Sequence, residues 1–221
     1  MVHRDYAAHF FRWSWLGRHF NDRANNWDVL EVGCGVDCPL VRLIKDGTVR
    51  KAIPRSYLGV DLNQLVDPPK TKWANFQGSF NFIERHNELG RVDAIVNLEV
   101  IEHMTREHGE ELLVAMRDHL RDASSTLFLS TPVFNGKAAA NHIHEYTIPE
   151  LRGLIEKTGY RVEKRFGTFA NLNDLKRVAS PQELKVLEDL RVFHSPDVVA
   201  CFLAPLYPDA SRNNMWVLKR A

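Results

Sequence analysis

The sequence contains no apolar run long enough to span a bilayer, and no apolar stretch of the signal-peptide type near residue 1. It also lacks internal repeats and low-complexity segments. Its only cysteines are Cys34, Cys38 and Cys201, an odd number without the paired spacing of a zinc site. These absences argue against a membrane-spanning, repetitive or disulfide-stapled protein. We therefore expect a cytoplasmic protein with free thiols and no membrane partner.

No charge of one sign dominates, since 29 Lys and Arg residues stand against 28 Asp and Glu residues. The resulting net charge of +1 neither supports nor excludes nucleic acid as a partner, because a basic face can lie within a neutral total. The 221 residues, of which 44% are hydrophobic, suit one domain around one core.

The apolar pattern predicts strands that alternate with helices. Short apolar segments predict strands at 27–32, 57–60, 72–77, 92–98, 126–130, 160–166 and 215–219. Apolar residues at helical spacing predict helices at 5–20, 39–45, 108–120, 149–158 and 181–190. This order is typical of a Rossmann-like α/β fold, with a mostly parallel seven-stranded sheet and helices on both faces.

One long segment interrupts this alternation before the last strand. We predict a single domain with an N-terminal helix in 1–24, a Rossmann-like core in 25–166 and 212–221, and a helical insertion in 167–211. The insertion includes an apolar stretch at 198–206, which needs a covering. Two interpretations stay open for it: a cap over one end of the sheet that orders further on binding, or a peripheral addition without a binding role.

The first strand leads into two closely spaced glycines, Gly33 and Gly35. Glycines at this place allow a sharp turn and let a ligand approach the backbone. Glu31 lies inside the strand, which is unusual for a dinucleotide-binding fingerprint. The third glycine of that fingerprint would fall at Cys38, so the loop is poorly suited to a pyrophosphate.

An acidic residue, Asp61, ends the second predicted strand. A carboxylate there can accept hydrogen bonds from both hydroxyls of a ribose. The alternative is a turn or helix-capping aspartate. Because the glycine loop lies at the correct distance upstream, we favour the ribose interpretation.

A further polar group follows the strand at 92–98. If the chain turns helical at Leu98, then Glu99, Glu102 and His103 share one helical face. Polar residues at 130–132 and 141–147 follow the next strand. Since the carboxyl ends of parallel strands meet at one edge, we expect these residues to lie beside one another.

These motifs, in this order, resemble those of class I S-adenosylmethionine-dependent methyltransferases. The resemblance covers about residues 25–165 and the last strand, and it includes Thr131-Pro132 ahead of Glu145-Tyr146-Thr147. The most similar groups are ubiquinone-biosynthesis-like O-methyltransferases and Hen-type small-RNA methyltransferases. The resemblance implies S-adenosylmethionine as cofactor. The cofactor-binding residues that it implies are Glu31, Gly33, Cys34, Gly35, Asp61, Leu62, Ser79, Phe80, Asn97 and Leu98.

Within that set, the resemblance implies a role for each part. Glu31 and the glycines would shape the cofactor loop, Asp61 would hold the ribose, and the backbone of Asn97 and Leu98 would line the methionine end. Family members usually have an aspartate after the third strand for the adenine amino group. Here Ser79 would replace it more weakly, and Phe80 would stack on the base.

The acceptor must lose a proton, and two ways of removing it stay open. His103 or His142, beside Glu102, could act as the base because histidine titrates near neutral pH. Hen-type enzymes instead bind a metal, and the resemblance places its ligands at Glu99, Glu102, His103 and His142, a set suited to manganese or magnesium. The Glu102-His103 pair also occurs in metal-free members of the family, so neither way is excluded.

The sequence thus predicts O- or N-methylation of an acceptor that is a small molecule or a nucleic acid, and it leaves the oligomeric state open. One alternative is a catalytically inactive methyltransferase fold that serves as a binding subunit, which the intact Glu31, Gly33, Gly35 and Asp61 set disfavours. The other is a nicotinamide-dependent oxidoreductase, which Cys38 at the third glycine position disfavours.

Overall fold

The computed structural model describes residues 4–23, 27–47 and 53–221. The predicted boundary at 24/25 therefore lies outside the described residues. None of the helices described in those ranges has the length and apolarity needed to cross a membrane.

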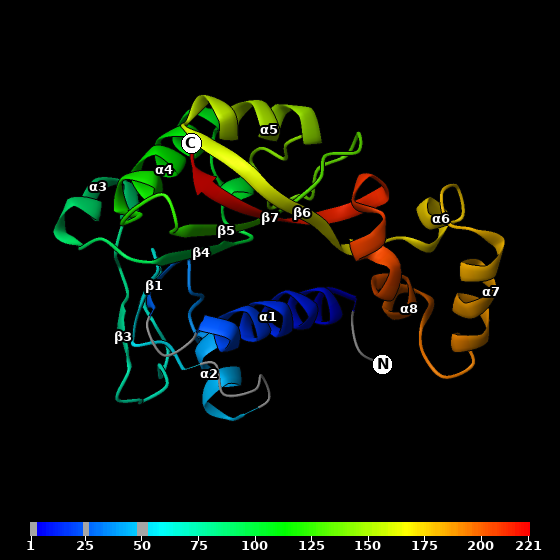
Figure 1. Ribbon diagram of the computed structural model, residues 1–221, viewed down its shortest axis with the longest axis horizontal. Coiled ribbons are helices and arrows are strands. Elements are labelled where there is room, and N and C mark those ends of the chain that lie inside the picture. The colour runs from blue at the N-terminus through cyan, green and yellow to red at the C-terminus, as the bar shows by residue number, and fades with distance from the viewer. Residues whose placement is uncertain (1–3, 24–26, 48–52) are drawn as a thin grey trace.

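A single seven-stranded sheet forms the centre of the molecule (Figure 1), in the order β3-β2-β1-β4-β5-β7-β6. Neighbouring strands from β3 through β5 run parallel, whereas β7 is antiparallel to both β5 and β6. This confirms the predicted Rossmann-like fold class. The strands are β1 (Asp28–Val32), β2 (Ser56–Val60), β3 (Ala74–Gln77), β4 (Ala94–Leu98), β5 (Thr126–Pro132), β6 (Tyr160–Ala170) and β7 (Ser211–Arg220).

Helices cover both faces of the sheet. On one face, α4 and α5 pack with α3 on a core that includes Leu112 and Ile155; on the other, α1 and α2 pack through residues such as Leu16 and Leu40. Buried apolar side chains at i, i+3 and i+4 explain these contacts, as the sequence pattern predicted. The bounds are α1 (Arg4–Arg23), α2 (Pro39–Lys45), α3 (Phe82–Arg85), α4 (Arg106–His119) and α5 (Ile148–Lys157), with 3₁₀ turns η2 (His86–Glu88) and η3 (Ile101–His103).

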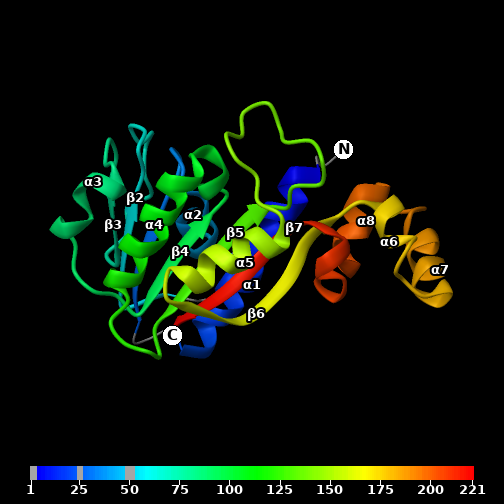
Figure 2. The same cartoon turned by 90° about the horizontal axis from the view of Figure 1, so that it is seen from above.

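The last two strands extend well past the predicted ends at 166 and 215. Thr168, Asn213 and Asn214 are buried polar residues in these extensions, so apolar periodicity alone could not reveal them. A helical lobe, residues 171–210, joins the two strands and projects away from the sheet (Figure 2). It contains α6 (Leu172–Leu175), α7 (Pro181–Leu190), α8 (Pro196–Leu203), η4 (Ala204–Leu206) and η5 (Pro208–Ala210).

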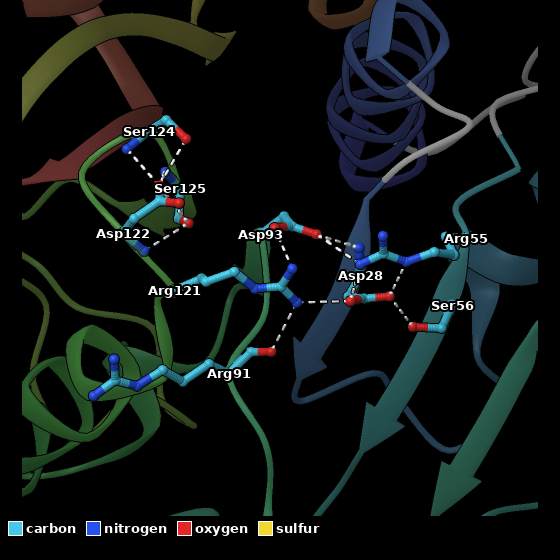
Figure 3. A network of polar contacts seen from close by, with 9 residues as sticks. All are labelled: Asp28, Arg55, Ser56, Arg91, Asp93, Arg121, Asp122, Ser124 and Ser125. Carbon is cyan, nitrogen blue, oxygen red and sulfur yellow. Dashed lines mark hydrogen bonds and ion pairs between the residues drawn. The ribbon is translucent and has the colours of Figure 1, made fainter.

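A network of ion pairs and hydrogen bonds lies at the edge of the sheet where the parallel strands begin (Figure 3). The Asp28 carboxylate accepts hydrogen bonds from Arg55, Arg121 and Ser56, and Asp93 accepts one from the Asp28 backbone N–H at 2.8 Å. The hydrogen bond from Arg55, against the cost of burial, lowers the pKa of Asp28 well below its usual range. The network joins strands β1, β2 and β4 at the edge opposite the predicted polar motifs.

Candidate functional site

Two cavities lie at the carboxyl ends of the central strands, where open α/β sheets bind ligands. The first, called here the glycine-loop cavity, has a volume of about 520 Å³ and is lined by residues that follow β1, β2 and β4. The second, the histidine cavity, has a volume of about 630 Å³ and is lined by residues that follow β4 and β5. His9, Glu99 and His103 line both, so the two cavities adjoin.

The glycine loop is fixed by backbone hydrogen bonds to the end of β2. Gly33 and Gly35 both have positive φ angles, +80° and +74°. The Gly33 N–H donates to the Val60 carbonyl at 2.9 Å, and the Gly35 N–H donates to Asp61 Oδ2 at 2.9 Å. Asp61 Oδ1 accepts the Asn63 N–H at 2.9 Å. The two predicted motifs are therefore one connected structure.

Most of the predicted cofactor-binding residues meet in this cavity. Those that line it are Glu31, Gly33, Cys34, Gly35, Asp61, Leu62, Phe80 and Leu98. Ser79 and Asn97 do not: the Ser79 hydroxyl donates to Gln64 at 3.2 Å, and the Asn97 amide donates to the Val32 carbonyl at 2.9 Å. Asn81, two residues after Ser79, lines the cavity instead.

Helix α1 supplies a wall that the sequence pattern did not indicate. His9 and Trp13 line the glycine-loop cavity, and their rings stack with centroids 5.1 Å apart. Arg12, three residues after His9 in the same helix, is only 2% exposed, and its guanidinium donates a hydrogen bond to Asn213 Oδ1 at 3.1 Å. The apolar spacing of this helix predicted a core contact. Burial of Arg12 is a property of the folded chain, so the sequence offered no local signal for this wall.

Glu31 is fully enclosed between its neighbours in the sheet. Tyr57 donates a hydrogen bond to its carboxylate. Burial raises the pKa of Glu31 well above its ordinary value of 4.5, and the Asp61 carboxylate adds to this effect. The surroundings of Glu31 thus favour its neutral form, and a cationic ligand group nearby would favour the anion.

The pH dependence of stability should differ between the wild type and Glu31→Gln. Because the native pKa is raised, the native state keeps a proton that the unfolded chain loses above pH 4.5. The contribution of this proton to the free energy of unfolding is complete below pH 4.5. It is lost as the pH rises through the native pKa, by at most about 1.4 kcal/mol per pH unit. Urea unfolding across a pH series should show the wild type losing stability relative to the variant. Parallel profiles would contradict this.

The predicted helical face after β4 does not form. Strand β4 ends at Leu98, Glu99 takes a left-handed conformation with φ +56°, and a 3₁₀ turn begins only at Ile101. Glu99 therefore does not share a helical face with Glu102 and His103. It accepts hydrogen bonds from Ser130 at 2.6 Å and Asn213 at 2.7 Å, and pairs with Arg12 at 3.7 Å. Burial opposes its charge, but Arg12 and these hydrogen bonds keep the pKa of Glu99 below its ordinary value.

The other three predicted metal ligands do gather. Glu102, His103 and His142 each place one ligand atom within 4.8 Å of the others. Two backbone hydrogen bonds explain this arrangement, since the N–H groups of Ile143 and His144 both donate to the Glu102 carbonyl, at 2.9 and 3.1 Å. They hold the loop after β5 against η3. Glu99 lines the same cavity but is not a member of this three-residue cluster.

Both histidines are oriented by an acceptor on Nδ1. His103 Nδ1 lies 3.0 Å from the Asn141 carbonyl oxygen, and His142 Nδ1 lies 2.6 Å from Glu145 Oε1. Because a carbonyl and a carboxylate only accept, each Nδ1 carries the proton, and the neutral ring has its lone pair on Nε2. Metal-binding histidines are oriented in this manner by their outer partners.

Glu102 is the member of the cluster whose buried carboxyl group is only partly hydrogen-bonded. It is 1% exposed; Oε2 accepts from Thr131 at 3.2 Å, while Oε1 has no hydrogen-bond partner among the described residues. Burial, together with the charge of Glu99, raises the pKa of Glu102 to about 9. A buried polar atom without a partner is costly, and a cation beside it would remove that cost.

The helical lobe does not cover either cavity. Among its described residues, 171–210, none lines the glycine-loop cavity or the histidine cavity; Phe169, Arg212 and Asn213, in the strands that lead to the lobe, line the latter. In this structure the described residues of the lobe therefore lie outside both cavities, and the cap interpretation and the peripheral interpretation both stay predictions. Within the apolar stretch at 198–206, Val199, Ala200 and Ala204 join a separate small core of the lobe, whereas Phe202 and Leu206 are exposed.

Comparison with known proteins identifies the family of this chain. Residues 8–165 match the family model described as a methyltransferase domain. Among curated proteins, no sequence matches the chain.

Several solved structures share the fold. A SAM-dependent methyltransferase from Archaeoglobus fulgidus superposes with a TM-score of 0.60 at 18% identity, covering 99% of this chain and 95% of that one. The methyltransferase domain of a bacterial Hen1, CtHen1, gives 0.58 at 18% identity, covering 96% and 99%. Magnesium protoporphyrin IX methyltransferase from Synechocystis PCC 6803, with bound SAH, gives 0.59 at 10% identity, covering 99% and 84%. Since the family model spans most of the chain and the sheet has the same architecture, the chain belongs to the methyltransferase-domain family, as a class I S-adenosylmethionine-dependent methyltransferase.

Proposed function

We propose that the chain binds S-adenosylmethionine in the glycine-loop cavity and methylates a hydroxyl-bearing acceptor in the histidine cavity. The observation that carries this proposal is the boundary shared by the two cavities, which His9, Glu99 and His103 line from both sides. The cofactor supplies a methyl group on a sulfonium that is its own leaving group. The protein must therefore align donor with acceptor, exclude water and accept a proton.

The residues around the glycine loop fit this cofactor. Asp61 Oδ2 accepts the Gly35 N–H, and Oδ1 accepts both the backbone N–H and the side-chain amide of Asn63. Because a carboxylate oxygen can accept two hydrogen bonds, Oδ2 can still receive a ribose hydroxyl. Phe80 is 2% exposed and lines the cavity, and Arg85 stacks on its ring at 4.5 Å, which suits contact with a base. Asn81, rather than Ser79, offers the polar side chain there.

Asp61→Ala should weaken the binding of S-adenosylhomocysteine by roughly 5- to 150-fold, corresponding to about 1–3 kcal/mol for stranding polar partners. The loss has two sources: the ribose hydroxyls lose an acceptor, and the Gly35 N–H loses its partner. Isothermal titration calorimetry measures it, with the exposed Asp46→Asn as a control. Tight binding of NAD in place of S-adenosylhomocysteine would overturn the cofactor assignment.

The histidine cavity fits a divalent cation held by Glu102, His103 and His142. The fit rests on the partnerless Oε1 of buried Glu102 and on the Nε2 lone pairs that Asn141 and Glu145 leave available. One carboxylate with two imidazoles suits manganese or a similar ion. Such an ion would polarise an acceptor hydroxyl and lower its pKa. Glu99, bound by Arg12, lies on the boundary with the glycine-loop cavity.

The acceptor that we propose is a polar molecule, either a small molecule or the end of a nucleic acid. The cavity is lined by the amides of Asn135, Asn141 and Asn213 and by Lys137, and these groups can bind hydroxyls and anionic groups. Without a cation, His103 could accept the proton directly through Nε2. Measuring turnover after chelation and after His103→Ala separates these two mechanisms: if chelation leaves turnover intact while His103→Ala abolishes it, the acid–base mechanism stands.

A further inference from the structure

Two thiols occupy the glycine loop that the proposed function uses to bind its cofactor. Cys34 and Cys38 are 1% and 0% exposed, and their Sγ atoms lie 4.0 Å apart. Both are free thiols, and the third cysteine, Cys201, lies in the helical lobe. The separation exceeds a disulfide bond by about 2 Å, a distance that side-chain rotation with a small loop adjustment can close. The two sulfurs are thus placed to react with one another.

The cavity gives a small oxidant access to this pair. Cys34 lines the glycine-loop cavity, although Cys38 does not. The hydrogen bond between the two thiols lowers the pKa of Cys38 and, together with burial, raises the pKa of Cys34, so Cys38 is the thiol that loses its proton first. A bound cofactor would fill the cavity in front of Cys34 and shield it. Access therefore depends on whether the cofactor site is filled.

Closing the bond would disturb the contacts that shape the loop. Cys38 has a left-handed conformation with φ +51°, and its thiol donates to the Gly35 carbonyl at 3.7 Å. The Gly35 N–H is the group that donates to Asp61. On the other side, Cys34 packs against β2, where a Cβ on Gly59 would lie 3.1 Å from its Sγ. Because Cys34 cannot move toward β2, Cys38 and the Gly35 turn must move.

We propose that Cys34 and Cys38 form a reversible disulfide with a peroxide, and that this modification weakens cofactor binding. The reaction balances as follows. One thiolate attacks a peroxide oxygen, giving a sulfenic acid and one water; the second thiol then displaces the sulfenic oxygen as another water, forming the S–S bond. Two thiols thereby lose two electrons and two protons to one hydrogen peroxide molecule, which becomes two waters. A dithiol reductant reverses the change.

The test treats the reduced, cofactor-free full chain with hydrogen peroxide and records its intact mass and its affinity for S-adenosylhomocysteine. We expect the wild type to lose two hydrogen atoms and about tenfold in affinity, the loss of one hydrogen bond to a charged group, and dithiothreitol to restore both. Cys201→Ala should behave as the wild type. Cys34→Ser and Cys38→Ala should not lose the two hydrogens, and saturating S-adenosylhomocysteine should slow the oxidation of the wild type.

The cofactor part of this inference rests on the proposed function, and the two readouts distinguish their failures. If the reduced wild type does not bind S-adenosylhomocysteine, the proposed cofactor site is wrong, while the mass still decides whether the disulfide forms. If the mass does not change, or changes equally in Cys34→Ser, the modification site is wrong. If the disulfide forms and affinity changes by less than about twofold, its effect on the loop is wrong.

Discussion

Glu102→Gln should lower the affinity of the protein for Mn²⁺ by at least about 100-fold, since changes to outer partners alone cost about 10- to 100-fold. The substitution preserves the shape of the side chain and its contact with Thr131 but removes the carboxyl group that could ionise beside a cation and bind it with His103 and His142. Calorimetry with Mn²⁺ alone measures the affinity without knowledge of the acceptor. Turnover on the acceptor, once it is known, should fall in parallel and should also be lost on chelation.

Two further variants make this result specific. Glu145→Gln leaves all three proposed ligands in place but weakens the acceptor on His142 Nδ1, so it should cost about 10- to 100-fold. Glu84→Gln, an exposed carboxylate on α3, should have no effect. If the wild type fails to bind Mn²⁺, or if Glu102→Gln binds it as tightly, the cluster does not hold a metal, and the base role of His103 becomes the remaining mechanism.

Gly33→Ala should destabilise the protein by about 2–5 kcal/mol and remove measurable cofactor binding, because backbone strain costs about 1–2 kcal/mol and overpacking about 1–3 kcal/mol. Gly33 has φ +80°, and a Cβ there would lie 2.3 Å from Cγ2 of Val100. The loop between β1 and α2 must shift to remove that overlap, and the Gly35 N–H moves with it. Urea unfolding and calorimetry with S-adenosylhomocysteine measure the two effects.

Gly47→Ala is the matched control for this substitution. Gly47 has a similar φ of +72°, but nothing lies within 4 Å of a Cβ built on it. It should therefore show the strain cost alone, about 1–2 kcal/mol, and bind cofactor normally. Adding Val100→Ala to Gly33→Ala should recover part of the stability. Equal destabilisation by Gly33→Ala and Gly47→Ala would show that contact with Val100 contributes nothing.

The sequence predicted those parts of the site that local chemistry determines. Gly33, Gly35 and Asp61 could be located because a tight turn and a strand-ending carboxylate each need particular residue types at fixed spacing. The family resemblance placed Glu102, His103 and His142 together, and the structure brings them within reach of one another. What the resemblance could not supply was the partner of each Nδ1, which depends on how the loop at 133–146 folds back.

The remaining parts depend on tertiary contacts that no local pattern records. The position of Glu99 follows from its left-handed backbone and from Arg12, 87 positions away in the chain, which a helical-face argument cannot anticipate. His9 and Trp13 line the cavity because α1 packs across the sheet, whereas their spacing indicated only an amphipathic helix. The ends of β6 and β7 were missed because buried polar residues replace the apolar alternation there.

The helical lobe has a small core of its own, formed by residues such as Leu175, Leu187 and Val199, and this core shares no member with the two cores that support the sheet. Substitutions inside the lobe can therefore accumulate without altering the packing beneath either cavity. Its remaining links are the two strands and a few contacts with α1, including the edge-on pair Phe11 and Phe202. The lobe thus packs as a unit of its own, and residues of its core can change while the two sheet cores keep their members.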